Sequence, residues 1–381
     1  MYNYFEQGPI RPPSEAQSLL IRVTRNCPWN KCAFCHTYTG SKFELRSVDD
    51  VKKDIRAMKA IADQIVQSSR DMGEQGEVNR NALKHLYNNG VLYDECFYNI
   101  SAWLYFGGES AFLQDANSLI VKTADLVEIL TFLREQFPQI KRITSYCRSH
   151  TAARKTVAEF KQLKQAGLSR IHIGMESGSN EVLALIHKGV AANDHIKAGL
   201  NIRESGIELS EYFMPGLGGV QWTREHALET ACVLNAINPD FIRLRTFHAV
   251  PGTGMDNLIK KGEFQPLSDE DIIGEIKLFI KNLEVQGTVL MSDHILNLLE
   301  EVEGRLPEDK LRLLSVIERY FALPQQERLI YRLGRRSGAL RRLDDLADRE
   351  SYLRLQGMAD SIAAEGSDLD THINTMMNYY I

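Results

Sequence analysis

The chain has 381 residues, of which 44% are hydrophobic and 25% are charged, and its formal net charge is −5. This composition excludes wholesale disorder, and the length predicts one catalytic domain of barrel size with one extension. A mildly acidic chain has no global attraction to nucleic acid or to anionic membranes, so we expect neither as a partner. The sequence shows neither a transmembrane run of about 18 apolar residues nor a secretory signal pattern, so we expect a cytoplasmic protein.

Hydrophobic patterns predict strands and helices that alternate along the first part of the chain. The predicted strands cover residues 18–26, 102–106, 142–146, 170–175, 207–214 and 241–247. The predicted helices cover residues 48–69, 124–135, 156–165, 181–187, 195–205 and 224–235. This alternation favours an α/β fold with a parallel sheet, and specifically a partial (β/α)6 TIM-like barrel. Functional residues are then expected at the C-terminal ends of the strands.

Two regions depart from this alternation. Residues 73–98 are polar and contain the turn dipeptide Asn89-Gly90, which predicts an insertion. Residues 266–381 have charged helical patterns without a predicted strand. We therefore expect a barrel domain over residues 1–265 and a helical C-terminal region over residues 266–381.

The C-terminal region is rich in arginine. Its clustered arginines are Arg328, Arg332, Arg335, Arg336, Arg341 and Arg342. Because aspartates are interspersed among them, a solvated helical face is the favoured interpretation, and RNA or phosphate binding is the alternative.

A cysteine motif of spacing C-x4-C-x2-C follows the first predicted strand, and it consists of Cys27, Cys32 and Cys35. Clustered cysteines in a reducing compartment indicate metal ligands rather than disulfides. Three thiolates on one loop can hold a [4Fe–4S] cluster and leave one iron open for chemistry.

One alternative to this cluster is a zinc site that adds His36. Another is an electron-transfer cluster with a fourth cysteine, taken from Cys96, Cys147 or Cys232. Because those three are scattered along the chain, we expect one cluster and no second.

The motif resembles that of the radical S-adenosylmethionine (SAM) superfamily. Residues 32–35, Cys-Ala-Phe-Cys, fit the second half of the family pattern C-x3-C-x-aromatic-C, and the first spacing is one residue longer. The resemblance extends over about residues 18–254. Within the superfamily, the sequence most resembles stand-alone proteins of the branch that includes the oxygen-independent coproporphyrinogen oxidases and the methylthiotransferases.

The resemblance implies an enzyme that reductively cleaves SAM on a [4Fe–4S] cluster held by the three cysteines. The product is a 5′-deoxyadenosyl radical that abstracts hydrogen from an unidentified substrate, and the electron comes from a donor such as a flavodoxin or ferredoxin. The alternatives are a non-catalytic Fe–S or haem-handling protein on the same fold and a zinc-stabilised binding protein. No catalytic residue is assigned.

The resemblance also implies residues that bind SAM. A Gly-Gly-Glu motif, Gly107, Gly108 and Glu109, closes the predicted second strand and resembles the segment that holds the SAM amino group, although alone it would be a turn. Glu176 ends the fourth strand and resembles the ribose ligand. Met214 ends the fifth strand and Gly216 lies just after it, and both belong to a segment that resembles the one shaping the adenine pocket.

Two further positions are less specific. Ser145 lies near the end of the third strand and is a candidate contact for SAM or substrate. In the sixth strand, Arg243 and Arg245 alternate with apolar residues and are expected to point inward. They would bind the SAM carboxylate or an acidic substrate, or form ion pairs. The candidate ion-pair partners are Glu176, Glu211 and Asp240.

Overall fold

The computed structural model describes residues 4–366 and 368–378. The chain forms two compact units. The first unit comprises the residues up to Asn30, Thr37–Gly174 and Lys197–Leu209, and the second comprises Lys31–His36, Met175–Ile196 and the residues from Ser210 onward. These units interleave along the sequence, and the expected boundary at residue 265 stays a prediction.

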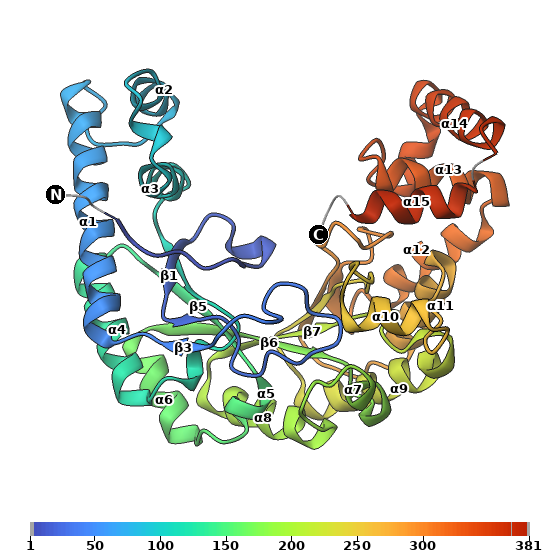
Figure 1. Ribbon diagram of the computed structural model, residues 1–381, viewed down its shortest axis with the longest axis horizontal. Coiled ribbons are helices and arrows are strands. Elements are labelled where there is room, and N and C mark those ends of the chain that lie inside the picture. The colour runs from blue at the N-terminus through green and yellow to red at the C-terminus, as the bar shows by residue number, and fades with distance from the viewer. Residues whose placement is uncertain (1–3, 367, 379–381) are drawn as a thin grey trace. The chain divides into compact units, whose positions relative to one another are not determined.

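Parallel strands form the centre of the first unit. They are β1 (Leu19–Arg22), β4 (Ser110–Gln114), β5 (Arg142–Cys147) and β6 (Leu168–Glu176), with β6 ending in the second unit. Helices α1 (Val48–Asp71), α4 (Thr123–Gln136) and α6 (Val157–Ala166) pack in series, and Figure 1 shows them following one another along one side of these strands. The smaller elements include η1 (Pro13–Glu15), β2 (Thr24–Arg25), β3 (Glu44–Leu45), α2 (Arg80–Asn88), η2 (Val91–Tyr93), α3 (Glu95–Tyr105), η3 (Ser118–Ile120) and α5 (Ser149–Ala152). Helix α8 (Ala192–Ser205) begins in the second unit and ends in the first.

Helix α1 illustrates how the sequence builds this layer. The side chain of Ser47 accepts a hydrogen bond from the backbone of Asp50 and so caps the N-terminus. The apolar stripe predicted from helical spacing is buried along its length and consists of Val51, Ile55, Met58, Ile61 and Ile65. The predicted helix over residues 48–69 is therefore confirmed.

The second unit continues the parallel pattern. Strands β7 (Glu208–Phe213), β8 (Phe241–Leu244) and β9 (Thr288–Met291) are parallel, and β10 (Gly304–Leu306) is antiparallel to β9. The helices are α7 (Asn180–Leu185), α9 (Gly219–Ile237), α10 (Gly254–Lys260), α11 (Asp269–Lys281), α12 (Lys310–Ala322), α13 (Gln325–Arg336), α14 (Arg349–Ala364) and α15 (Leu369–Met377), with η4 (Leu343–Ala347) between α13 and α14. Helix α11 packs against α9 and α12, and Figure 1 shows these helices in colours from yellow-green to orange.

The main sheet has the strand order β1-β4-β5-β6-β7-β8-β9-β10, which is mostly parallel and open. The predicted α/β class, with a parallel sheet and helical crossovers, is confirmed. The predicted second strand, residues 102–106, is wrong, because these residues lie in or just after α3 and the strand is β4. The apolar residues that suggested a strand include Trp103, which α3 buries against Phe137.

The region after residue 265 also differs from the prediction, because it contributes β9 and β10 to the sheet. Both strands are short, so they show too few alternations to be recognised. The expected insertion, residues 73–98, folds into α2, η2 and the start of α3, and side chains of Asn79 and Asp94 cap the two α-helices.

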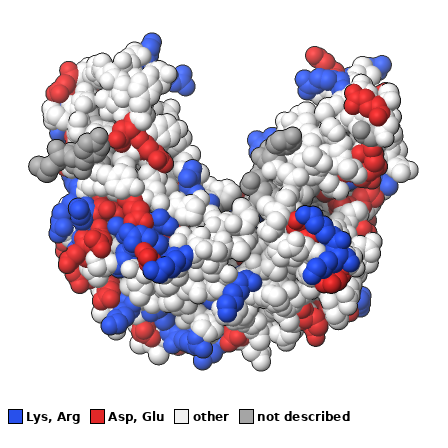
Figure 2. Space-filling view, in the orientation of Figure 1, with Lys and Arg blue, Asp and Glu red and all other residues white. Residues whose placement is uncertain are grey.

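The arginines of α13 do not form a solvated face. Arg332, Arg335 and Arg336 are buried, and the first and last of these contact the buried carboxylate of Asp269 over 2.9 and 2.8 Å. That expectation is therefore wrong for these three, while Arg341 and Arg342 are exposed. Acidic and basic side chains are intermixed over the face shown in Figure 2. Within the described part of the chain, no helix has the length and apolar character needed to cross a membrane.

Candidate functional site

The three motif cysteines lie on the irregular loop that follows β1 and β2, as the sequence predicts. All three side chains are partly exposed, and none forms a disulfide. The backbone N–H of Cys35 donates to the carbonyl of Cys32 over 3.1 Å, which folds the C-x2-C segment into a turn. Among the described residues, no three His, Cys, Asp or Glu side chains converge as ligands of a single metal ion. Because [4Fe–4S] clusters are held by cysteine thiolates, the three cysteines stay the candidate cluster ligands.

One buried carboxylate holds both flanks of this loop. Asp115 directly follows β4, is fully buried and has a φ of 75°, which is uncommon for a residue other than glycine. Its Oδ2 accepts hydrogen bonds from the backbone of Asn26 over 3.1 Å and from Arg22 over 2.8 Å. Its Oδ1 accepts from the hydroxyl of Tyr38 over 2.9 Å. Because these partners stand on either side of the cysteines, Asp115 fixes where the loop begins and ends.

The middle of the loop belongs to the second unit. The backbone N–H of Ala33 donates to the carbonyl of Ile186, and the N–H of Met255 donates to the carbonyl of Ala33, each over 2.9 Å. A side chain at Gly254 would bring its Cβ to 3.0 Å from the Ala33 Cβ, which is tighter than an ordinary contact, so glycine allows this close approach. Ala33 and Phe34 pack against a buried apolar cluster formed by Val182, Ile186, Met214, Leu217, Phe247, Met255 and Phe264.

The carboxyl groups of Glu176 in β6 and Glu211 in β7 lie near the ammonium group of Lys188. Glu176 ends β6 with a φ of 65°, and its Oε1 accepts a hydrogen bond from Lys188 Nζ over 3.0 Å. The same ammonium lies 5.6 Å from the ring centroid of Phe34, which places it against the cysteine loop. Burial, together with the charge of Glu176, raises the pKa of Glu211 well above its usual range. Neither carboxylate oxygen of Glu211 has a hydrogen-bond partner among the described residues.

The segment after β7 is anchored from several sides. The N–H of Met214 donates to the carbonyl of Glu176 over 3.0 Å, and the carbonyl of Met214 lies 3.0 Å from Nε2 of buried His226. The N–H of Gly216 donates to the carboxylate of Glu275 over 2.7 Å, and burial raises the pKa of that carboxyl group. Gly216 has a φ of 88°, which glycine adopts without strain. Hydrogen bonds therefore hold the segment with Met214 and Gly216 next to Glu176.

Arg243 is buried, and its guanidinium forms an ion pair with Asp293 in the segment after β9. The sequence predicted an anion near this position, but the partner is none of the three acids considered. Arg245 is exposed instead of being buried beside it. The difference arises because β8 ends at Leu244, so the alternation that was used to orient both arginines stops there.

The Gly-Gly-Glu segment lies at the opposite end of its strand from the predicted one. Gly107, Gly108 and Glu109 precede β4 rather than follow it, and Glu109 forms an exposed ion pair with Lys141 over 2.5 Å. The prediction that this segment closes a strand is wrong, because it was built on the misassigned strand at residues 102–106. Ser145 is fully buried within β5, and its hydroxyl donates to the carbonyl of Tyr146 over 3.1 Å.

Sequence reasoning missed Asp115, Lys188 and, as a site residue, Glu211. Asp115 carries a local signal, because it directly follows the apolar strand residues 111–113 and the strand-ending Gln114. Lys188 follows α7 in a short His-Lys-Gly segment that has no pattern of its own, so only the contact with Glu176 reveals it.

Comparison with known proteins bears on this arrangement. Residues 92–231 match the model of the radical SAM superfamily. This chain carries a radical SAM domain. Domains of this superfamily use a [4Fe–4S] cluster and SAM, which are therefore the cofactors of this domain. The matched range contains β4 to β7 and hence Glu176, Lys188 and Glu211.

The chain is also similar to curated proteins over part of its length. It is 29% identical to a tRNA uridine(34) acetyltransferase of Methanocaldococcus infernus over 126 residues, which are 33% of this chain and 23% of that protein. A protein of the same description from Dehalococcoides mccartyi is 25% identical over 120 residues, which are 31% of this chain and 26% of that protein. The chain thus spans about a quarter of the length of these relatives.

Solved structures with related chain paths include two radical SAM enzymes. Coproporphyrinogen III oxidase of Escherichia coli has a TM-score of 0.43 and 16% identity, with 69% of this chain and 52% of that chain covered. The cobalamin-dependent radical SAM enzyme OxsB has a TM-score of 0.47 and 14% identity, with 95% of this chain and 53% of that chain covered.

Proposed function

We propose that the protein is a radical SAM enzyme that uses Cys27, Cys32 and Cys35 to hold its [4Fe–4S] cluster and that abstracts hydrogen from a substrate. The observation that supports this most directly is the contact between Phe34 of the cysteine loop and Lys188, which is also bonded to Glu176. It brings the metal-binding loop and the carboxylates of the β6 and β7 strands into one neighbourhood of the second unit. When bound, the cluster supplies the electron that breaks the sulfonium bond of SAM.

The protein's own residues then bind and orient SAM. Glu176 is placed to accept hydrogen bonds from the ribose hydroxyl groups, and Lys188 is placed to pair with the SAM carboxylate. Glu211 is buried without a hydrogen-bond partner in the described structure, so a hydroxyl or ammonium group of SAM would satisfy it. The anchored segment at Met214 and Gly216 provides an apolar wall with Leu217. An electron donor such as a flavodoxin or ferredoxin would reduce the cluster.

The cysteine assignment is tested by two matched triple variants. In one, Cys27, Cys32 and Cys35 are replaced by serine, and in the other Cys96, Cys147 and Cys232 are replaced. After anaerobic reconstitution, we expect about four irons per chain in the parent and in the second variant, and almost none in the first. With dithionite and SAM, 5′-deoxyadenosine should form only where iron is retained.

Other results would contradict the proposal in different ways. Stoichiometric zinc without iron would favour a zinc-stabilised binding protein. Iron at about four per chain without SAM cleavage would favour a non-catalytic Fe–S protein. A fall from about eight irons to four in the second variant would show a second cluster.

A further inference from the structure

The ends of strands β8 and β9 carry a second group of polar side chains. The two strands are parallel, with Arg243 opposite Met291. Arg245 and Asp293 each lie two residues further along, so they follow the same edge of the sheet as His294. C-terminal ends of parallel strands are where α/β folds place their ligands.

The charges at this edge do not balance. The carboxylate of Asp293 is paired with the buried guanidinium of Arg243. Arg245 is exposed, and in the described part of the chain its guanidinium has no carboxylate or hydrogen-bond partner. The guanidinium group of Arg245, with its several N–H donors, is therefore available to bind a ligand at the strand ends.

His294 adds a neutral donor next to this cation. The backbone N–H of Leu296 donates to Nδ1 of His294 over 3.3 Å, so the ring carries its proton on Nε2. Burial, and then the charges of Arg245 and Arg336, lower the pKa of His294 to about 3. The ring is thus neutral at physiological pH, and its Nε2–H has no acceptor among the described residues.

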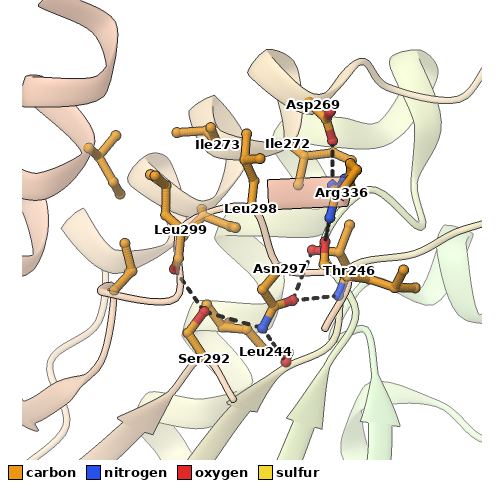
Figure 3. A pocket seen from close by; sticks show the side chains of 14 residues that line it. Leu244, Thr246, Asp269, Ile272, Ile273, Ser292, Asn297, Leu298, Leu299 and Arg336 are labelled. Carbon is orange, nitrogen blue, oxygen red and sulfur yellow. Dashed lines mark hydrogen bonds and ion pairs between the residues drawn. The ribbon is translucent and has the colours of Figure 1, made fainter. Parts of the chain in front are cut away.

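A rigid frame holds this segment, as Figure 3 shows. The side chain of Asn297 accepts from the backbone of Thr246 over 3.0 Å and donates to the carbonyl of Leu244 over 2.9 Å. From α13, Arg336 donates to the carbonyl of Leu296 over 2.8 Å and pairs with Asp269. These bonds fix the backbone on both sides of Arg245 and close to His294, so ligand binding does not have to order the backbone of this segment.

We propose that Arg245 and the Nε2–H of His294 bind an anionic group, a carboxylate or a phosphate, on the substrate. This inference rests on the proposed function, because it assigns a substrate to the same radical SAM site. A guanidinium matches the planar or tetrahedral oxygens of both anions. SAM has its own cation in Lys188 beside Glu176, so Arg245 serves a different ligand.

The test uses the reconstituted protein with SAM and follows the histidine ring signals by NMR during titration with inorganic phosphate or sodium acetate at constant ionic strength. The His294 signal is assigned with His294→Gln. We expect a saturable shift of this signal, and the anion that binds more tightly identifies the substrate group. Arg245→Gln should weaken that binding at least about 10-fold, since a charge-assisted hydrogen bond is lost. Arg245→Lys should restore part of it.

A matched control is Arg349→Gln, which removes an exposed arginine of α14 in the same unit and should leave the titration unchanged. No saturable shift with either anion, or equal binding by Arg245→Gln, would overturn the proposal. An equally large loss of SAM affinity in Arg245→Gln would also overturn it, because Arg245 would then bind the cofactor. Failure of the proposed function would appear separately, as missing iron or missing SAM cleavage in the parent.

Discussion

Charged residues are treated differently in two regions of the molecule. Around the flanks of the cysteine loop, Arg22 and Arg25 pair with Glu6, and Arg22 also pairs with Asp115. In β7 of the second unit, by contrast, Glu211 is buried near the carboxylate of Glu176, and Lys188 is bonded to Glu176. The first arrangement is satisfied and stabilises a shape. In the second arrangement the buried carboxyl group of Glu211 lacks hydrogen-bond partners among the described residues. Burying such a group costs free energy, and a ligand that supplies hydrogen-bond donors would offset that cost.

The largest effect is expected at another satisfied cluster, in which Asp269 is enclosed by Arg332 and Arg336. Asp269→Asn should lower the free energy of unfolding by about 3–5 kcal/mol, because it leaves the buried guanidinium of Arg336 without its anion and leaves Arg332 with Asp370 alone. Urea denaturation would measure it. Glu318→Gln, which breaks an exposed pair with Lys277, should cost no more than about 1 kcal/mol. Equal losses in the two variants would show that burial of the pair is unimportant.

The next effect concerns the incompletely satisfied region. Lys188→Met should weaken SAM binding by about 10- to 100-fold, because one charge-assisted contact is lost. Lys188→Arg should retain most of the affinity. Equilibrium dialysis with the reconstituted protein measures both, and Lys277→Met is the control lysine, because its partner is the exposed Glu318. Unchanged affinity in Lys188→Met would remove this residue from the SAM site.

The third effect is a pH dependence. Burial and the neighbouring Glu176 raise the pKa of Glu211 in the folded state above its ordinary value of 4.5. The folded protein therefore retains a proton that the unfolded chain releases, so stability falls as the pH rises from that value to the folded-state pKa. The slope should reach about 1.4 kcal/mol per pH unit. In Glu211→Gln this component should vanish.

Unfolding midpoints measured at several pH values from 4.5 upward would reveal this difference. Glu263→Gln, which changes an exposed carboxyl group, should keep the slope of the parent. If Glu211→Gln and the parent showed the same slope, Glu211 would be ionised in the folded protein, and the contrast between the two regions would disappear.

The smallest effect is expected at the clamp of the cysteine loop. Asp115→Asn keeps one acceptor oxygen but loses a charge-assisted bond, so an anaerobic chelator should remove iron about 3- to 10-fold faster. Asp54→Asn is the matched control, because Asp54 is also buried and its bonds go to Glu6 and Arg46, which lie outside the loop. Equally fast iron loss from both variants would mean that general destabilisation, rather than the clamp, controls retention.

The sequence predicted those features that depend on local patterns. Residues 170–175 were recognised as a strand because Ile171, Ile173 and Met175 alternate with other residues, and β6 covers them. The strand predicted over residues 142–146 is covered by β5. The cysteine motif is likewise local. Residues 102–106 misled the prediction, because an apolar run can be buried as well by α3 as by a strand. Glu109 was misplaced with it.

Other features could not be predicted, because they depend on residues far apart in the chain. The clamp joins Asp115 to Asn26 and Tyr38, and the ion pair of Arg243 with Asp293 joins β8 to the segment after β9. In both cases, the sequence around one residue gives no indication of which distant residue it contacts. Similarly, the burial of Arg332 and Arg336 depends on Asp269, and β9, β10 and α12 stand between them in the chain.

The backbone bonds of Ala33 have a consequence for how the protein is made. Ala33 pairs with Ile186 and with Met255, both of which leave the ribosome long after the cysteines. The loop therefore cannot reach its final shape while the chain is still short, since its closing contacts are highly non-local. Cluster insertion should consequently be a late event, completed after most of the chain has been synthesised. Until then, the early cysteines are exposed to the cell as thiols on an unfinished nascent chain.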